Sequence, residues 1–335
     1  MTPFDSRLLA GFAAAGEAFR PGATLLAVSG GADSVALLAS CAALRDRRHP
    51  AESLAVATVD HGIRPDGAGA ADAAFVAVLC ASLPRVECRV MTLGNGAVQD
   101  CAARRGRGIE DAARHLRYQA LEEAARELGC PVVCLAHTRN DVLETILFRF
   151  LQGSEDAGGI PRRRTFTDGH GVFVRPLLGT SRAEVEAYLT ARRIFWRTDV
   201  TNADGAYLRN RVRRDLIPKL DALFPGWDRA ALSGAEKGAD NAAVIGALAD
   251  SLTWVRIGDG AACVQAKAFF ALPRAVRREL IYRALALIDT HARFPYTLIS
   301  RFIVGGEGNR HFMRVDTGEV ALEKKYGRVW VRKVA

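Results

Sequence analysis

The sequence predicts a doubly wound α/β fold with a mainly parallel sheet, followed by a helical domain and a small C-terminal β element. From Thr24 onwards, short apolar runs alternate with helical stretches. This order favours right-handed βαβ units and a sheet covered on both faces. Region 230–254 is alanine-rich with a helical period, 269–288 is a second amphipathic helical stretch, and after Phe312 short alternating segments are separated by glycines. These two changes of period predict the helical domain and the β element.

Each element of the α/β region rests on its own pattern. Apolar runs bounded by glycine, proline or polar residues predict strands at 24–28, 54–59, 86–91, 131–136 and 172–177. Mostly apolar helical stretches predict the intervening helices at 34–45, 68–83, 109–128 and 141–151. Gly129 ends the long third helix. Further on, helices are expected at 230–254 and 269–288, the second broken by Pro273, and strands at 320–322 and 328–332.

A chain of 335 residues is long for a single core, so two or three domains are expected. Pro218, Pro225 and Gly226 interrupt the helical pattern. We therefore predict a catalytic domain at 1–220 and a helical region with its β element at 221–335.

Composition narrows the class of protein. No apolar run approaches the roughly twenty residues that span a bilayer. The first twenty residues lack a secretory signal pattern, so a cytoplasmic protein without membrane association is expected. The seven cysteines form no C-x-x-C pair and sit mostly in apolar stretches, which predicts reduced, packed thiols.

The formal net charge is +9, and arginine dominates it. Arginines cluster at 162–164, 192–193, 209–214 and 277–278. The planar guanidinium suits phosphate, and a basic surface attracts polyanions. Nucleic acid is therefore a candidate partner, with a solvated cationic surface as the alternative.

The most informative motif is the turn between the first strand and the first helix of the sheet, Ser29-Gly30-Gly31-Ala32-Asp33-Ser34. Glycines allow a tight turn, and backbone N–H groups at a helix N-terminus form an anion site. The lysine of the common P-loop is absent. Asp33 inside a phosphate site would repel phosphate unless a divalent cation lies between them. The alternative is a simple turn in which Asp33 caps the helix.

This turn resembles the signature of the PP-loop ATP pyrophosphatases, whose fold is of the adenine nucleotide alpha hydrolase type. Within them, further segments resemble the tRNA(Ile)-lysidine synthetases. They are VDHGIR at 59–64, ARHLRY at 113–118, AHTRNDVLET at 136–145, RPLLGTSRAEVEAYL at 175–189 and DVTNADGAYLRNRVRRDLIPKL at 199–220. The resemblance covers nearly all of the first domain and continues more weakly at 272–280.

The resemblance implies a ligase that uses ATP and Mg²⁺. The O2 atom of the wobble cytidine of a minor isoleucine tRNA with a CAU anticodon attacks the α-phosphate and releases diphosphate. The amine of free L-lysine then displaces AMP from C2, giving lysidine and changing the codon read from AUG to AUA. A homodimer is also suggested. This reaction requires phosphate neutralisation, in-line geometry and a neutral amine.

Catalytic roles are expected for Asp33, Arg117, Asp141 and Glu144, with Asp33 and Asp141 as metal ligands. If the helix after the fourth strand begins early enough to include His137, one of its faces would carry His137, Asp141 and Glu144. The alternative makes Thr138 the N-cap and Asp141 a first-turn acid. The sequence has Thr138 and Asn140 where the family usually has His and Asp.

Three arginines and one histidine complete the expected site. Arg114 lies three residues from Arg117 on one helix face, and we expect it to bind tRNA. Arg209 and Arg211 are expected to bind tRNA through its phosphates, or to contact ATP phosphate. The alternative is that they belong to an arginine-rich helix whose side chains are solvated. His61, which follows the second strand, joins the turn as an expected nucleotide-binding residue, although a lone histidine is often structural.

Two alternatives stay open. Another PP-loop enzyme would thiolate tRNA or amidate a small molecule. Thiolation generally needs a catalytic cysteine or a cluster-binding C-x-x-C, and amidation needs a glutaminase segment or partner; no such cysteine motif or glutaminase segment is evident. A tRNA-binding protein with a degenerate nucleotide site is the alternative from another class. Its support is the replacement at Thr138 and Asn140.

Overall fold

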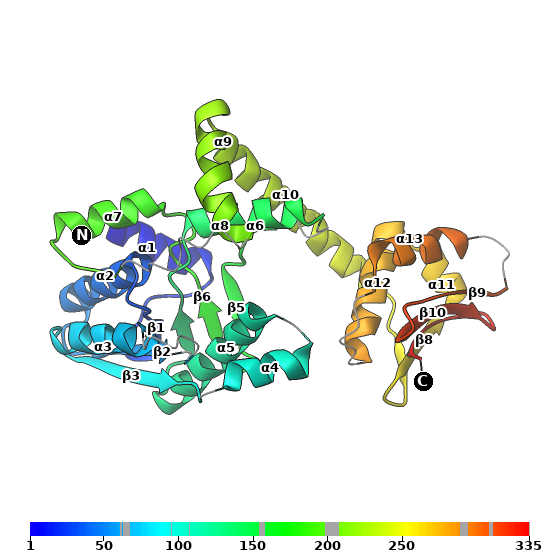
Figure 1. The fold of residues 1–335 in the computed structure, drawn as a ribbon, viewed down its shortest axis with the longest axis horizontal. Helices are drawn as coiled ribbons and strands as arrows, with labels where there is room; N and C mark the ends of the chain where they lie inside the picture. Colours follow the sequence, from blue (N-terminus) through cyan, green and yellow to red (C-terminus); the bar gives the residue numbers. More distant parts are fainter. Residues whose placement is uncertain are drawn as a thin grey trace. The chain divides into compact units, whose positions relative to one another are not determined.

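The computed structural model describes residues 1–60, 62, 68–94, 96–106, 108–153, 158–197, 208–288, 294–307 and 311–334. The chain forms two compact units, Met1–Glu236 and Lys237–Ala335, each with its own core (Figure 1). The division falls within helix α10 (Trp227–Ala249). The boundary at 220/221 stays a prediction.

The first unit is built on a six-stranded sheet in the order β3-β2-β1-β4-β6-β5. Its strands are β1 (Thr24–Ala27), β2 (Leu54–Asp60), β3 (Val86–Thr92), β4 (Val132–Cys134), β5 (Arg163–Thr165) and β6 (Val172–Val174). Every pairing is parallel except that of β5 with β6, which is antiparallel. The predicted mainly parallel sheet is confirmed. Its edge strand β5 was not predicted, because its residues are exposed and polar.

Helices cover both faces of this sheet because successive strand residues point to opposite sides. Leu26 packs with α1 (Pro3–Ala14), α2 (Ala32–Arg48), α3 (Ala68–Ala81) and α7 (Arg182–Ala191). Leu25 packs on the other side with α5 (Ile109–Glu127). The remaining elements of this unit are η1 (Pro21–Ala23), α4 (Ala97–Arg105), α6 (Arg139–Leu151), α8 (Leu208–Arg211), the π-helical η3 (Val212–Leu216) and α9 (Ile217–Leu223).

The second unit contains an antiparallel sheet in the order β7-β8-β11-β10-β9. Its elements are β7 (Val255–Ile257), β8 (Ala261–Gln265), α11 (Ala266–Ala271), α12 (Arg274–Leu287), α13 (Tyr296–Gly305), β9 (Met313–Asp316), β10 (Val320–Lys325) and β11 (Arg328–Lys333). The helical region and C-terminal β element are confirmed. The break at Pro273 separates α11 from α12, because proline has no N–H to continue a helix. Across the ranges given above, no helix is both long and apolar enough to cross a membrane.

Candidate functional site

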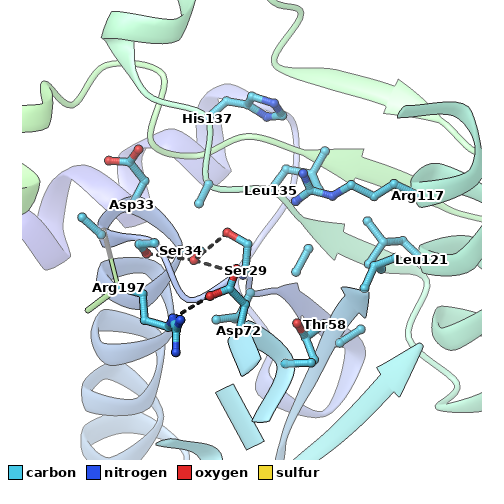
Figure 2. Close-up of a pocket in the computed structure, with 18 of the residues that line it drawn as sticks. Ser29, Asp33, Ser34, Thr58, Asp72, Arg117, Leu121, Leu135, His137 and Arg197 are labelled. Carbon is cyan, nitrogen blue, oxygen red and sulfur yellow. Dashed lines mark hydrogen bonds and ion pairs between the residues drawn. The ribbon is translucent and has the colours of Figure 1, made fainter. Parts of the chain in front are cut away.

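A cavity of about 620 Å³ opens at the carboxyl ends of β1, β2 and β4 (Figure 2). Parallel α/β sheets bind ligands at this edge, and the volume suits a nucleotide. Five of the six turn residues predicted from sequence line it: Ser29, Gly31, Ala32, Asp33 and Ser34.

The turn is held by its own serines. The Ser29 backbone N–H donates to Ser34 Oγ at 3.1 Å, and that hydroxyl donates to the Gly31 carbonyl at 2.9 Å. Gly30 has φ +86°, and a Cβ there would lie 3.3 Å from the Phe75 ring. Glycine is required by both the backbone conformation and the close packing. The result is a fixed turn that leads directly into the N-terminus of α2, which suits an anion.

Asp33 stands in this turn with an incomplete set of partners. Its Oδ1 atom is buried and has no hydrogen-bond partner in the described structure. Its Oδ2 atom lies 3.9 Å from Arg182 Nη1. Burial raises the pKa of Asp33 to about 6; Arg182 opposes the shift and Asp141 adds to it. Asp33 does not cap the helix, because Gly31 is the N-cap, so that alternative is wrong.

The segment after β4 begins with a helix cap rather than a row of free ligands. Thr138 is the N-cap of α6, and its backbone N–H and hydroxyl donate to Asp141 Oδ2 at 2.8 and 3.0 Å. Asp141 still lines the cavity, and its Oδ1 atom lies 3.9 Å from Arg213 Nη2. The helix starts at Arg139, so His137 precedes it and the expected shared helical face is wrong for that residue.

Glu144 is almost fully buried and is held by Arg213. Arg213 Nε and Nη2 donate to its two carboxylate oxygens at 2.6 and 2.9 Å. The Glu144 side chain is not among the cavity-lining residues, whereas Arg213 is. This bidentate pair therefore fixes the position of a cation at the cavity.

Arg117 and His137 supply the opposite side of the cavity (Figure 2). Arg117 makes no hydrogen bond or ion pair with any other described residue, and burial lowers its pKa. Burial also lowers the pKa of His137 to about 3, so its imidazole is neutral at pH 7. Its Nδ1 atom is buried without a described partner. The cavity thus contains an unpaired cation, which favours an anionic ligand.

The donor set is compatible with Mg²⁺. Mg²⁺ typically takes one or two protein carboxylates and completes its shell with water and substrate phosphates. Asp33 has an unpartnered buried oxygen, and Asp141 faces the same cavity. The described residues contain no cluster of three or more potential metal ligands. A metal shared with substrate phosphates therefore fits better than an all-protein cage.

The other predicted residues lie elsewhere. Arg114 is exposed and donates to the Tyr118 hydroxyl at 3.4 Å. Arg211 is exposed on α8. Neither lines the cavity. His61 lies outside the described residues, as does the side chain of Arg209, whose backbone belongs to α8.

Sequence reasoning did not single out four charged residues that line the cavity: Asp72, Arg182, Arg197 and Arg213. Arg182 and Arg213 lay inside segments that resemble the family, so a signal for them existed. No sequence signal marked Asp72, which lies in an alanine-rich helix, or Arg197. Only tertiary packing brings α3 and the segment after α7 together.

The first unit matches a known family of protein domains. The PP-loop domain family matches residues 5–220, and the chain belongs to this family. The family resemblance seen in the motifs is thus confirmed, and membership supports the use of ATP.

Similar curated proteins include tRNA(Ile)-lysidine synthases. That of Treponema denticola is 38% identical over 284 residues, which cover 82% of this chain and 58% of the relative. That of Treponema pallidum (strain Nichols) is 44% identical over 219 residues, 62% of this chain and 42% of the relative. That of Deinococcus radiodurans is 42% identical over 229 residues, which cover 68% of this chain and 36% of the relative. The chain spans about half the length of the curated relatives it matches.

Among solved structures, the U34-tRNA thiolase NcsA of Methanococcus maripaludis is similar in fold. The TM-score is 0.55 at 16% identity, covering 70% of this chain and 77% of the thiolase. This likeness concerns the fold alone.

Proposed function

We propose that this protein joins free L-lysine to C2 of the wobble cytidine of tRNA(Ile) with a CAU anticodon, at the expense of ATP. The products would be lysidine, AMP and diphosphate, and the tRNA would read AUA instead of AUG. We further propose that it acts in the cytoplasm and that it forms a homodimer. The 38% identity to a lysidine synthase over 82% of this chain supports the proposal.

The observation that carries the proposal is the combination, in one cavity, of the Ser29–Ser34 turn with Asp33 and the unpaired Arg117. The turn offers backbone N–H groups to phosphate. Leu121 and Leu135 give the cavity apolar walls that suit a purine base. A triphosphate laid across this cavity has an anion site at one end and a cation at the other.

In the first step, cytidine O2 forms a bond to the α-phosphorus, and the bond to the β-phosphate oxygen breaks. Arg117 is proposed to stabilise the charge on the α-phosphate or to hold the cytidine. Asp33 and Asp141 would hold Mg²⁺, which supplies neutralisation of phosphate charge when bound. The neutral His137 adds no charge to this cavity, because its pKa is about 3.

In the second step, the neutral lysine amine forms a bond to C2 and the C2–O2 bond breaks, so that AMP leaves with the former O2 atom on its phosphate. The proton lost from the amine passes to solvent. Asp141 remains the proposed contact for a lysine ammonium group, because its Oδ1 atom is not used by the helix cap. Glu144 is proposed to act by holding Arg213 at the cavity.

A basic surface beside the cavity suits tRNA phosphates. Arg114 and Arg164 are exposed, and their guanidinium carbons lie 5.5 and 4.7 Å from the centre of the Tyr118 ring. Tyr118 follows Arg117 directly on α5. A polyanion bound by these arginines would be held next to the proposed reaction site.

Incubation with radiolabelled lysine, ATP, Mg²⁺ and total bacterial tRNA tests the proposal. We expect ATP-dependent transfer of lysine into an alkali-stable nucleoside, and no transfer by Asp33→Asn. ATP consumption without lysine in the tRNA would contradict the assigned acceptor.

Thiolation of tRNA by the same fold is the competing enzymatic function. The cavity-lining residues within the described ranges include no cysteine. Six of the seven cysteines are buried, and Cys88 is half-buried on β3. Thiol chemistry therefore has no support from these residues. A degenerate site that binds tRNA without turnover predicts normal tRNA binding with no diphosphate release.

A further inference from the structure

Three parts of the first unit meet at one point beside the Ser29–Ser34 turn. The backbone N–H of Arg197, in the segment after α7, donates to the carbonyl of Gly30 at 2.9 Å. Asp72 lies in the first turns of α3, and its carbonyl oxygen is 3.8 Å from the position of a Cβ on Gly30. The Arg197 backbone is thus hydrogen-bonded to the turn proposed to bind phosphate, and the Asp72 backbone packs against it.

The side chains of these two residues pair with each other in the wall of the cavity. Arg197 Nε lies 2.6 Å from Asp72 Oδ1, and both residues line the cavity (Figure 2). In Figure 2 they lie beside Ser29 and Ser34. The other arginines that line the cavity either pair with different carboxylates or, like Arg117, have no described partner. Arg197 is therefore a cation beside the serines of the turn, held by a carboxylate.

The pair is partly exposed to solvent. The Arg197 side chain is 44% exposed and that of Asp72 is 33% exposed. Ion pairs with this much solvent contact are weak, because water screens the charges and competes for the hydrogen bonds. A phosphate group carries more charge than a carboxylate and accepts two parallel hydrogen bonds from a guanidinium. A phosphate chain in the turn would therefore compete well for Arg197.

We propose that Arg197 is a further phosphate-binding residue of this site, and that Asp72 holds it in place until a triphosphate or diphosphate takes over the guanidinium. This inference rests on the proposed use of ATP. It assigns Asp72 a role opposite to that of Asp33. Asp72 competes with phosphate for a cation, whereas Asp33 is placed to share a cation with phosphate. Release of diphosphate would then be assisted by the return of Arg197 to Asp72.

Calorimetric titration of the full chain with inorganic diphosphate, ATP with Mg²⁺, and adenosine tests the exchange. We expect Arg197→Gln to weaken diphosphate and ATP binding about tenfold and to leave adenosine binding unchanged. Asp72→Asn should strengthen diphosphate binding by about threefold, because it removes the competing charge. Opposite effects from the two partners of one ion pair distinguish exchange from a structural contact.

Arg89→Gln is the matched control, because Arg89 pairs with Glu127 away from the cavity at similar exposure. It should bind all three ligands as the unsubstituted protein does. A thermal melt of each variant reports whether it is folded. Equal weakening by Arg197→Gln and Asp72→Asn, or a parallel loss of adenosine binding, would overturn the inference. If the unsubstituted protein fails to bind ATP, the proposed function fails instead.

Discussion

The Ser29–Ser34 turn and the segment 137–144 lie at the ends of neighbouring strands and both contribute carboxylates, yet they differ in how those carboxylates are used. Asp33 keeps a buried oxygen without a described partner and has a pKa raised to about 6. Asp141 gives one oxygen to a helix cap, and Glu144 gives both to Arg213. Acidic residues at one sheet edge are therefore not equivalent. Both oxygens of Glu144 are held by Arg213 and one oxygen of Asp141 is held by a helix cap, whereas Asp33 keeps a buried oxygen that can take a ligand.

This difference predicts that Asp33→Asn has the largest effect on turnover. We expect diphosphate release to fall by about 10²–10³-fold, because an amide lacks the charge needed to hold a divalent cation near phosphate. The affinity for tRNA should stay nearly unchanged. Diphosphate release and filter binding measure the two quantities, and release near the unsubstituted rate would remove Asp33 from the proposed mechanism.

Glu144→Gln tests whether the carboxylate held by Arg213 stabilises the fold. It leaves Arg213 beside a neutral amide in a buried position, so the free energy of unfolding should fall by about 1–3 kcal/mol, less than for a fully buried pair because Arg213 is 42% exposed. Urea unfolding measures the loss. Glu279→Gln, which removes an exposed helical partner of Arg283, should change the free energy of unfolding by less than about 0.5 kcal/mol.

The raised pKa of Asp33 predicts a pH dependence of stability. Asp33 keeps its proton up to about pH 6 in the folded state, whereas the pKa of an unperturbed aspartate is 3.8. Between these two values the folded state binds more protons, so the Asp33 contribution to stability falls as pH rises. Relative to the unsubstituted protein, Asp33→Asn should therefore gain about 1–3 kcal/mol at pH 7.5, and most of this gain should disappear by pH 4. A gain that is the same at both pH values would show that burial does not shift this carboxyl.

The smallest expected effect is a change in tRNA binding on substitution of arginines outside the cavity. Arg211 is exposed on α8, and Arg211→Ala should reduce the slope of log affinity for tRNA against log salt concentration by about one unit. The same prediction applies to Arg209→Ala. Arg89→Ala serves as the control on β3, and an unchanged slope for Arg211→Ala would place tRNA elsewhere.

Much of the fold was accessible from sequence because its signals are local. Alternation of apolar strands with helices predicted the sheet and its parallel pairing, and the glycines of the turn fixed the loop after β1. Strand β5 and the strands β7, β8 and β9 were not predicted. Their pairing partners lie elsewhere in the chain, and short exposed segments carry little periodicity.

The sequence by itself determined the anion-binding turn, the position of Asp33 within it, and the class of protein. These depend on residue types at fixed spacing along a strand–turn–helix unit. Only the tertiary structure decided which charges remain available. Capping commits part of Asp141, the approach of η3 commits Glu144 to Arg213, and the packing of α3 sets Asp72 against Arg197. The physical reason is that the ionic partner of a side chain is chosen by distance in space, which spacing along the chain does not encode.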